Sequence, residues 1–398
     1  MWFGSPIVER LTGRIYCKSM IYLDYNATSP IHPDVRASMS RVLDGNYGNP
    51  SSLHAAGREA REAVEQARRT CLSAIGDPAG QLIFTSGGTE ADNLAVKGLA
   101  RALKQKGNHL IVSSVEHHAV LQPAEALREE GFRVTEVGVD RHGVLKLEDL
   151  RNAVTPETVL VSVMHANNEV GTIQPIAEAA AIARAQGALF HSDAVQSFGK
   201  VSLPASSDRP DALSLSAHKL GGPKGVGALY LRKGVKIAPT QQGGPHERNL
   251  RAGTEGVPGI VGMEAAVRLS VREEKEKVPA RVLALREMLE KGLLEKVPDA
   301  VVNGHPTQRL PGTLNLSFRG CTGETLLIAL DLEGICVSTG AACSSGSTEP
   351  SHVLTAMRLP ADQVEGSIRF SLGRGTTREE IQRCLQIIPR VVERVRRA

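Results

Sequence analysis

The chain reads Ser214-Leu215-Ser216-Ala217-His218-Lys219, and twenty-six residues before this lysine Asp193 stands in Phe190-His191-Ser192-Asp193-Ala194-Val195-Gln196. Each run is typical of a short buried strand that carries its polar residue at the carboxyl end, where open α/β sheets bind ligands. A lysine amine and a carboxylate are the two groups that a pyridoxal-phosphate enzyme supplies from its own chain, one for a Schiff base and one for the ring nitrogen. A lysine in a glycine-rich turn is by itself an ordinary surface residue, so this interpretation depends on what accompanies it.

The first feature that supports this interpretation is a predicted phosphate-binding turn, which we call the phosphate seat. The strand-like run 81–85 is followed by Ser86-Gly87-Gly88-Thr89-Glu90, which leads into a helical stretch. Glycines let backbone N–H groups approach an anion, and a helix N-terminus adds about half a positive charge. A Gly-Gly pair alone is often only a turn, but beside the lysine and the aspartate it predicts where a phosphate binds.

Composition narrows the class of protein. The chain has 398 residues, 41% of them apolar and 23% charged, with a net charge of +4. This is long enough for two domains with substantial cores, and the values are those of a globular protein. Both charge signs are interspersed, so neither a nucleic-acid face nor a basic tail is expected. No apolar stretch approaches the ~18 residues that span a bilayer, which predicts a soluble protein without membrane contact.

The cysteines and histidines point to chemistry without a resident metal. Six cysteines show no CxxC pair, and twelve histidines show no HxxxH spacing. The cysteines therefore indicate free thiols in a reducing compartment, and we expect a cytoplasmic protein. A metal site built by this chain is not expected.

Short β-branched runs alternate with amphipathic stretches from about residue 80 to residue 235. This rhythm is typical of a mostly parallel sheet flanked by helices. The expected strands are 81–85, 109–113, 132–137, 158–163, 187–191, 211–216 and 226–231. The expected helices between them are 89–106, 118–130 and 175–186.

The second part of the chain has a different pattern of expected helices and strands. After the Gly/Pro segment 243–259, a long charged helical stretch over 260–297 indicates the passage between two domains. Strands at 313–318, 335–338 and 367–371, mixed with helices at 324–332 and 378–397, are typical of an α+β domain. The last helix opens with Thr376-Thr377-Arg378-Glu379, the pattern of a capping box.

The predicted domains follow from these changes. We expect a large domain over 33–275 and a smaller one over 276–398, with an N-terminal segment, 1–32, that packs with the small domain. Residues 1–19 form an expected extension, and Met20, directly before a strand-like run, is the expected natural start.

Several further motifs complete the pattern. They lie at residues 22–28, 48–52, 84–90, 116–120, 165–171, 216–219, 251–255, 337–346 and 368–374. In this order they resemble the cysteine desulfurases, a branch of the class V, fold-type I pyridoxal-phosphate enzymes. The resemblance covers residues 20–398 and implies an α/β fold, with a large domain of mostly parallel sheet flanked by helices and a smaller α+β domain.

The resemblance also implies roles for individual residues. Pyridoxal 5′-phosphate would be bound to Lys219 as a Schiff base, Asp193 would pair with its ring nitrogen, and His117 would stack on the ring and help to transfer protons. His118 matches a variable position and is expected to be a solvated helix residue. Further cofactor contacts would come from Gly88, Thr89, Asn168, Gln196, Ser216, His218 and, across a homodimer interface, Thr254.

Substrate residues are implied in the same way. Arg369 would grip the substrate carboxylate, because a planar guanidinium can do so with two hydrogen bonds, and Asn168 would assist it. Cys343 lies in a run of small residues, 338–347, within the small domain, and would attack the substrate sulfur and carry it outward as a persulfide. It is also the one expected ligand of an iron–sulfur cluster during transfer. Cys71, Cys321, Cys336 and Cys384 are expected to be small core residues.

The implied reaction converts L-cysteine into L-alanine and a Cys343 persulfide. The sulfur acceptor stays open among an iron–sulfur scaffold, a tRNA-thiolation protein and another sulfur carrier. A selenocysteine lyase shares most of these residues and remains the alternative within this class. A class V aminotransferase has no use for Cys343, and a non-catalytic sulfur-relay scaffold has no need of Lys219, His117, Arg369 and Cys343 together.

Overall fold

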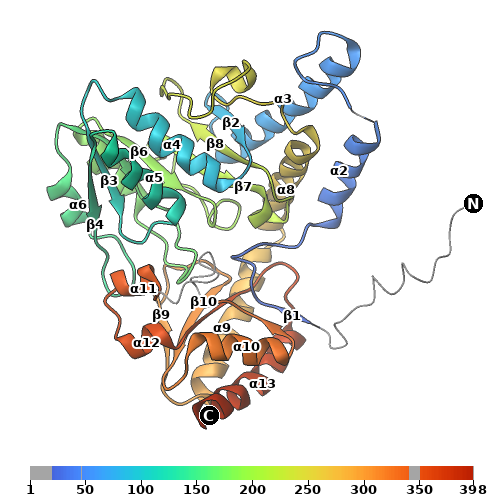
Figure 1. Ribbon diagram of the computed structural model, residues 1–398. Coiled ribbons are helices and arrows are strands. Elements are labelled where there is room, and N and C mark those ends of the chain that lie inside the picture. Colours follow the sequence, from blue (N-terminus) through green and yellow to red (C-terminus); the bar gives the residue numbers. More distant parts are fainter. Residues whose placement is uncertain (1–19, 46, 340–349, 398) are drawn as a thin grey trace, which may run out of the picture.

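The computed structural model describes residues 20–45, 47–339 and 350–397, which form a larger and a smaller lobe (Figure 1). The larger lobe contains a seven-stranded sheet with the order β2-β8-β7-β6-β5-β3-β4. Its strands are β2 (Gln81–Thr85), β3 (His109–Ser113), β4 (Arg133–Val137), β5 (Thr158–Ser162), β6 (Leu189–Asp193), β7 (Ala212–Ser216) and β8 (Gly227–Leu231). Strand β8 runs antiparallel to β2 and β7, and the other pairings are parallel.

Helices cover both faces of this sheet because neighbouring residues of a strand point to opposite sides. In β2, Ile83 packs with α4 (Gly88–Ala102) and α5 (His118–Glu129). Its neighbours Leu82 and Phe84 pack with α3 (Ala55–Ile75) and α8 (Val257–Lys275). Helix α2 (Pro33–Gly45) packs in the same cluster through Val35. Further along that face, the sheet packs with α6 (Leu147–Ala153) and α7 (Ile176–Ala185).

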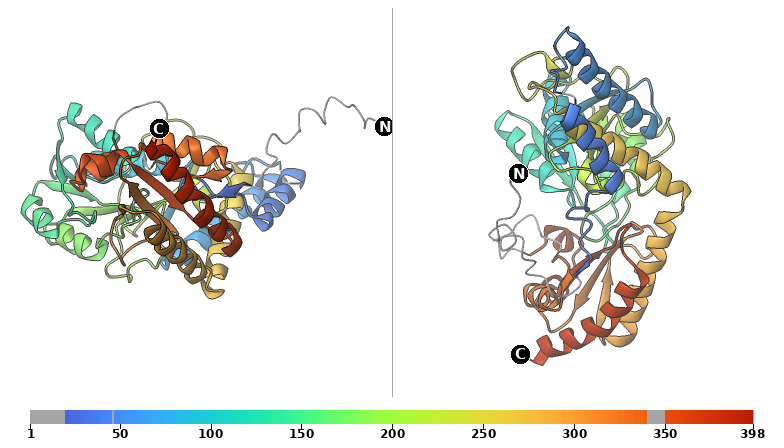
Figure 2. Two further views of the ribbon diagram at one scale, coloured as in Figure 1. Left: turned by 90° about the horizontal axis from the view of Figure 1, so that it is seen from below. Right: turned by 90° about the vertical axis from the view of Figure 1, so that its right-hand side faces the viewer.

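The smaller lobe is built on an antiparallel sheet with the order β12-β10-β9. Its strands are β9 (Ala300–Asn303), β10 (Thr313–Phe318) and β12 (Ser367–Ser371). Helices α9 (Val278–Lys296), α10 (Gly323–Leu332) and α13 (Arg378–Arg397) supply apolar residues to its core, and α11 (His352–Ala356) and α12 (Ala361–Glu365) lie nearby. The right-hand view of Figure 2 shows α8 and α9 following one another along one side of the molecule, from the larger lobe to the smaller.

The N-terminal segment returns to the smaller lobe. Strand β1 (Ile21–Tyr22) pairs in parallel with β11 (Ile335–Cys336), as Figure 1 shows near the junction of the lobes. The residues that follow β1 continue along β12, where Asp24 bridges Ser371. Among the described residues, no helix is long and apolar enough to cross a membrane.

The predicted fold class is confirmed, and the predicted strands of the large sheet each match an observed strand to within a few residues. The expected helix over 260–297 is in fact two helices, because the backbone at Lys277 turns left-handed with φ of 59°. The capping box lies one residue later than expected: the Thr377 N–H donates to Glu380 and the Glu380 N–H donates to Thr377. The domain boundary near residue 275 stays a prediction.

A buried ion pair fixes the strand that leads to the predicted phosphate seat. The Arg68 guanidinium donates to both carboxylate oxygens of Glu247, at 2.8 and 3.0 Å, and to the carbonyl of Leu82. The Phe84 N–H donates to the same carboxylate at 2.9 Å. Arg68 and Glu247 are 5% and 6% exposed, so Glu247 is the buried counter-charge of Arg68. The Arg68 Nε also donates to the partly exposed Glu65 carboxylate at 3.1 Å.

We therefore expect Glu247→Gln to lower the free energy of unfolding by about 3 kcal/mol, because it removes the buried counter-charge of Arg68 and leaves only the partly exposed carboxylate of Glu65. Urea denaturation would measure the change. The control is Glu148→Gln, whose partner Arg151 is largely exposed, and it should cost less than about 1 kcal/mol. Equal losses in the two variants would contradict the prediction.

Candidate active site

The structure brings Asp193 and Lys219 to one edge of the large sheet. Asp193 is the last residue of β6, and Lys219 lies in the short helix η1 (Ala217–Leu220) that follows β7. Because β6 and β7 are parallel neighbours, their carboxyl ends meet. Asp193 accepts a 2.8 Å hydrogen bond from the Val195 N–H. Burial raises the pKa of Asp193 to about 6, although this hydrogen bond and the Lys219 charge both act to lower it.

The predicted phosphate seat lies at the same edge. Helix α4 begins at Gly88, where a Cβ atom would stand 2.8 Å from Val195 Cγ2 and 3.6 Å from Ser216 Cβ, so the close approach requires glycine. Ser216 is 3% exposed, and its Oγ has no hydrogen-bond partner in the described part of the chain. A buried hydroxyl that lacks a partner, beside a helix N-terminus, fits a bound phosphate. Thr89 is exposed in the first turn of this helix.

The two histidines of the site are held by local contacts. His117 caps α5, and its Nδ1 accepts a 3.0 Å hydrogen bond from the Ala119 N–H, so a neutral ring carries its proton on Nε2. Burial, followed by the Lys219 charge, lowers the pKa of His117 to about 4. His218 lies 3.1 Å from the Thr28 hydroxyl, and burial lowers its pKa to about 4 as well. His118 is exposed, as expected.

Arg369 is buried in β12 and is 2% exposed. A buried arginine requires an anion, and here the anion is Asp24, whose Oδ1 accepts a 2.9 Å hydrogen bond from Nη2. Nη1 of Arg369 donates to the Asn168 carbonyl oxygen at 3.0 Å, which brings the two expected substrate residues together. Sequence reasoning assigned no role to Asp24, although it quoted the motif that contains it.

Asn26 is a second residue that sequence reasoning missed, and it connects four of the expected site residues. Its backbone carbonyl accepts hydrogen bonds from the Gln196 amide, at 2.9 Å, and from the Lys219 amine. Its side-chain amide donates to the Asn168 carbonyl at 3.1 Å, and this carbonyl also binds Arg369. The signal in the sequence was the motif at 22–28, which precedes the large domain but joins its site in space.

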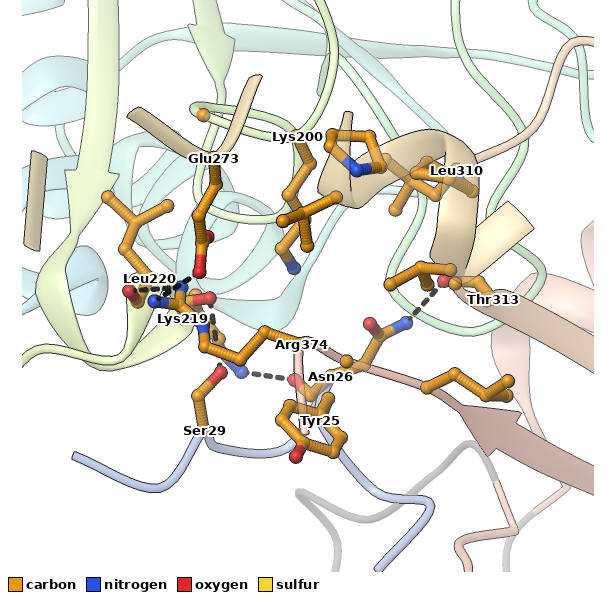
Figure 3. Close-up of a pocket in the computed structure, with 18 residues that line it drawn as sticks. Tyr25, Asn26, Ser29, Lys200, Lys219, Leu220, Glu273, Leu310, Thr313 and Arg374 are labelled. Atoms are coloured by element: carbon orange, nitrogen blue, oxygen red, sulfur yellow. Dashed lines mark hydrogen bonds and ion pairs between the residues drawn. The ribbon is translucent and has the colours of Figure 1, made fainter. Parts of the chain in front are cut away.

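A cavity of about 70 Å³ lies beside Lys219, between the two lobes (Figure 3). Its polar wall includes Lys200, Glu273 and Arg374, and its apolar wall includes Leu310. The Lys200 amine donates to the side-chain amide oxygen of Gln196, Oε1, at 3.4 Å. Burial, followed by the charge of Lys219, lowers the pKa of Lys200 to about 7.

Two expected site residues are not brought to this edge by the described chain. Thr254 is exposed, and no described hydrogen bond joins it to Gly88, Ser216 or His218. Cys343 lies outside the described residues. The cysteines expected in the core behave differently from one another: Cys71, Cys321 and Cys384 are buried, whereas Cys336 is half-buried, and all four are free thiols.

Comparison with known proteins agrees with this arrangement. The family model for aminotransferase class-V proteins matches residues 21–384. The chain is 48% identical to cysteine desulfurase IscS of Dictyoglomus turgidum (strain DSM 6724 / Z-1310), over 95% of this chain and 96% of that protein. It is 47% identical to cysteine desulfurase IscS of Methanosarcina thermophila, over 94% and 93% of the two chains.

Solved structures give the same result. A NifS-like protein superposes with a TM-score of 0.88 at 38% identity, covering 94% of this chain and all of the other. The protein SspA, solved in complex with cysteine, superposes with a TM-score of 0.76 at 33% identity, covering 90% of this chain and all of SspA. The chain belongs to the aminotransferase class-V family, and within it to the cysteine desulfurases.

Proposed function

We propose that this cysteine desulfurase binds pyridoxal phosphate at the carboxyl edge of the large sheet and transfers the sulfur of L-cysteine to Cys343. Three observations support the proposal. Asp193 and Lys219 lie at one edge of the sheet. The Lys219 charge acts on His117. Arg369 is connected to Lys219 through the hydrogen bonds of Asn168 and Asn26. Asp193 would pair with the ring nitrogen of the cofactor, and Lys219 would supply the amine for the Schiff base. His117 would carry protons, and Arg369 would bind the substrate carboxylate.

The family uses pyridoxal phosphate, and the residues present fit it. When bound, the cofactor supplies an electron-withdrawing ring that stabilises negative charge at the substrate Cα. Lys219 would hold its aldehyde carbon and Asp193 its ring nitrogen, while Gln196 and Asn168 would contact the ring oxygen. Gly88, Thr89, Ser216 and His218 would bind its phosphate, as the close packing at Gly88 and the partnerless Ser216 hydroxyl support.

Protons would move through Lys219 and His117. Lys219 Nζ would take the proton from the substrate Cα, since Lys219 lies at the same edge of the sheet as Asp193. The lowered pKa of His117 keeps its ring neutral near pH 7, so it can accept a proton and return it. Because Nδ1 is occupied by the Ala119 N–H, the exchange would take place at Nε2.

Arg369 would hold the substrate carboxylate. Its guanidinium is buried in a strand, and its contact with the Asn168 carbonyl orients it. The substrate would thereby have its Cα fixed between the guanidinium and Lys219, and this positioning favours proton removal at one atom.

Sulfur transfer would end on Cys343. Its thiolate would attack Sγ of L-cysteine, the Cβ–Sγ bond would break, and Cβ would gain a proton, so one thiol and L-cysteine give one persulfide and L-alanine. The persulfide would pass to an acceptor protein, either an iron–sulfur scaffold or a sulfur carrier. The free thiols of the described cysteines support work in the reducing cytoplasm.

We also propose a homodimer, in which Thr254 reaches the phosphate bound by the partner subunit. Thr254 is exposed in a single chain, which such a role requires. Apolar side chains around the connection between α2 and α3 are also exposed, Leu43 at 68%, Tyr47 at 92% and Leu53 at 83%. Exposed apolar groups of this size are typical of protein contacts.

Without cofactor, Asp193→Asn should change how stability depends on pH. Because burial raises the Asp193 pKa from 3.8 to about 6, the folded chain binds this proton more tightly than the unfolded chain. The stabilisation is complete below pH 3.8 and is lost as the pH rises through about 6. Between about pH 4 and pH 7 the parent should therefore lose about 2 kcal/mol relative to Asp193→Asn, as measured by urea denaturation.

The control for this prediction is Asp149→Asn, which removes an exposed carboxyl in the first turn of α6. It should follow the parent at each pH. If the stability of the parent instead rose with pH relative to Asp193→Asn, burial would not raise the Asp193 pKa, and the prediction would be wrong.

Arg369→Lys should raise the KM for L-cysteine by about 10- to 100-fold, because an ammonium cannot make the two parallel hydrogen bonds of a guanidinium. Steady-state assays of alanine release would measure it. Arg319→Lys, at an exposed ion pair of the small lobe, should leave KM unchanged. An unaltered KM in Arg369→Lys would remove this residue from the substrate site.

Cys343→Ala should lower alanine formation from L-cysteine about 100-fold or more, since no thiol then accepts the sulfur. Alanine and sulfide are measured with purified protein, together with the mass of the Cys343 peptide, which should gain one sulfur atom in the parent. Cys336→Ala is the matched control and should remain active. Full alanine formation in Cys343→Ala would contradict the persulfide role, and turnover of L-selenocysteine alone would identify a selenocysteine lyase.

A further inference from the structure

Asn26 lies where the N-terminal segment passes between the two lobes. It is 4% exposed and follows β1, and its side chain makes hydrogen bonds to residues 142 and 287 positions away in the sequence. Its amide nitrogen donates to the Asn168 carbonyl of the large lobe at 3.1 Å and to the Thr313 hydroxyl, at the start of β10, at 2.9 Å. Its backbone N–H donates to the Ser371 hydroxyl at 3.0 Å. These three hydrogen bonds fix the peptide unit of a loop residue from both lobes.

The Asn26 backbone fixed in this way holds the Lys219 amine through its carbonyl oxygen. Lys219 Nζ donates to the Asn26 carbonyl (Figure 3). It also donates to the Ala27 carbonyl, at 2.8 Å. The Gln196 amide donates to the same Asn26 carbonyl at 2.9 Å. Two carbonyl acceptors stabilise an ammonium and restrict a side chain that otherwise has several rotatable bonds.

The cavity beside Lys219 makes such restraint necessary. Lys219, Asn26 and Thr313 all line it, so the lysine side chain has open space on one side. Lys200 lines the same space and carries a second amine. When both amines are protonated they repel each other, and the carbonyl oxygens at Lys219 offset this repulsion.

We propose that Asn26 is a positioning residue that holds the Lys219 amine in place whenever this amine is not bonded to the cofactor. The inference rests on the proposed function, in which Lys219 leaves the cofactor when substrate binds and then has to act on a single proton. The hydrogen bonds of the Asn26 side chain fix the position of the Asn26 backbone carbonyl, and this carbonyl accepts the hydrogen bond of the Lys219 amine. The shared Asn168 carbonyl, which also binds Arg369, connects this anchor to the substrate clamp.

The test measures the reactivity of individual lysines in the full-length chain after removal of any bound cofactor. Succinimidyl acetate is added for increasing times, and peptide mass spectrometry gives the acetylation rate of Lys219. Lys291, whose side chain is 81% exposed on α9, serves as the internal reference. In Asn26→Ala we expect Lys219 to react about threefold faster or more, relative to Lys291, because its amine loses fixed acceptors.

Asn303→Ala is the matched control. The Asn303 amide is also buried and also donates two hydrogen bonds, to Asn315 and Ser317 at 2.7 Å each, but within the small-lobe sheet. It should destabilise the protein to a similar extent and leave the Lys219 rate unchanged. An equal rate increase in both variants would mean general loosening and would overturn the proposal, as would an unchanged rate in Asn26→Ala.

Thr313→Val provides a second variant in case Asn26→Ala does not fold. It removes one of the two acceptors of the Asn26 amide and keeps the side-chain shape. We expect a smaller increase in the same direction, and no increase would overturn the proposal. The labelling requires no turnover, so a chain without desulfurase activity that still shows this pattern would contradict the proposed function and not the role of Asn26.

Discussion

The meeting of opposite charges at the carboxyl edge of the large sheet is the constraint on which the site depends. Asp193 ends β6, and the half-buried Lys219 follows the neighbouring strand β7. Burial disfavours the charged form of Asp193, whereas the Val195 N–H and the Lys219 charge favour it. The Lys219 amine in turn donates to the Asn26 and Ala27 carbonyls. A buried acid whose pKa is shifted and which lies beside a specific charged partner is typical of functional sites.

A short N-terminal stretch links the two lobes at this edge. Residues 21–22 extend the small lobe through β11, Asp24 bridges the end of β12, and Asn26 contacts the large lobe. These few residues supply partners to Arg369, Gln196 and Lys219, although they lie far from all three in sequence. The position of the segment explains why its motif accompanies the motifs of the large domain.

Much of this arrangement could be predicted because it depends on local patterns. Buried strands such as 81–85 and 212–216 are continuous apolar or small-residue runs, and Asp193 and Lys219 follow from strand ends and chemistry. Contacts across hundreds of residues leave no such pattern: Asp24 and Arg369 are 345 positions apart. The break at Lys277 was missed for a different reason, since the charged residues around it favour helix. Pro279, in the first turn of α9, was the signal in the sequence, because its missing N–H cannot continue the preceding helix.

Under the proposed function, the pairing of Arg369 with Asp24 would make substrate recognition an exchange of partners. The structure gives Arg369 a resident carboxylate, so an arriving carboxylate would have to replace Asp24 or share Arg369 with it. The net gain would be the difference between two similar ion pairs, so it would be smaller than either of them. A thiol compound without a carboxylate would offer Arg369 no replacement for Asp24, and the resident acid would then select against such molecules.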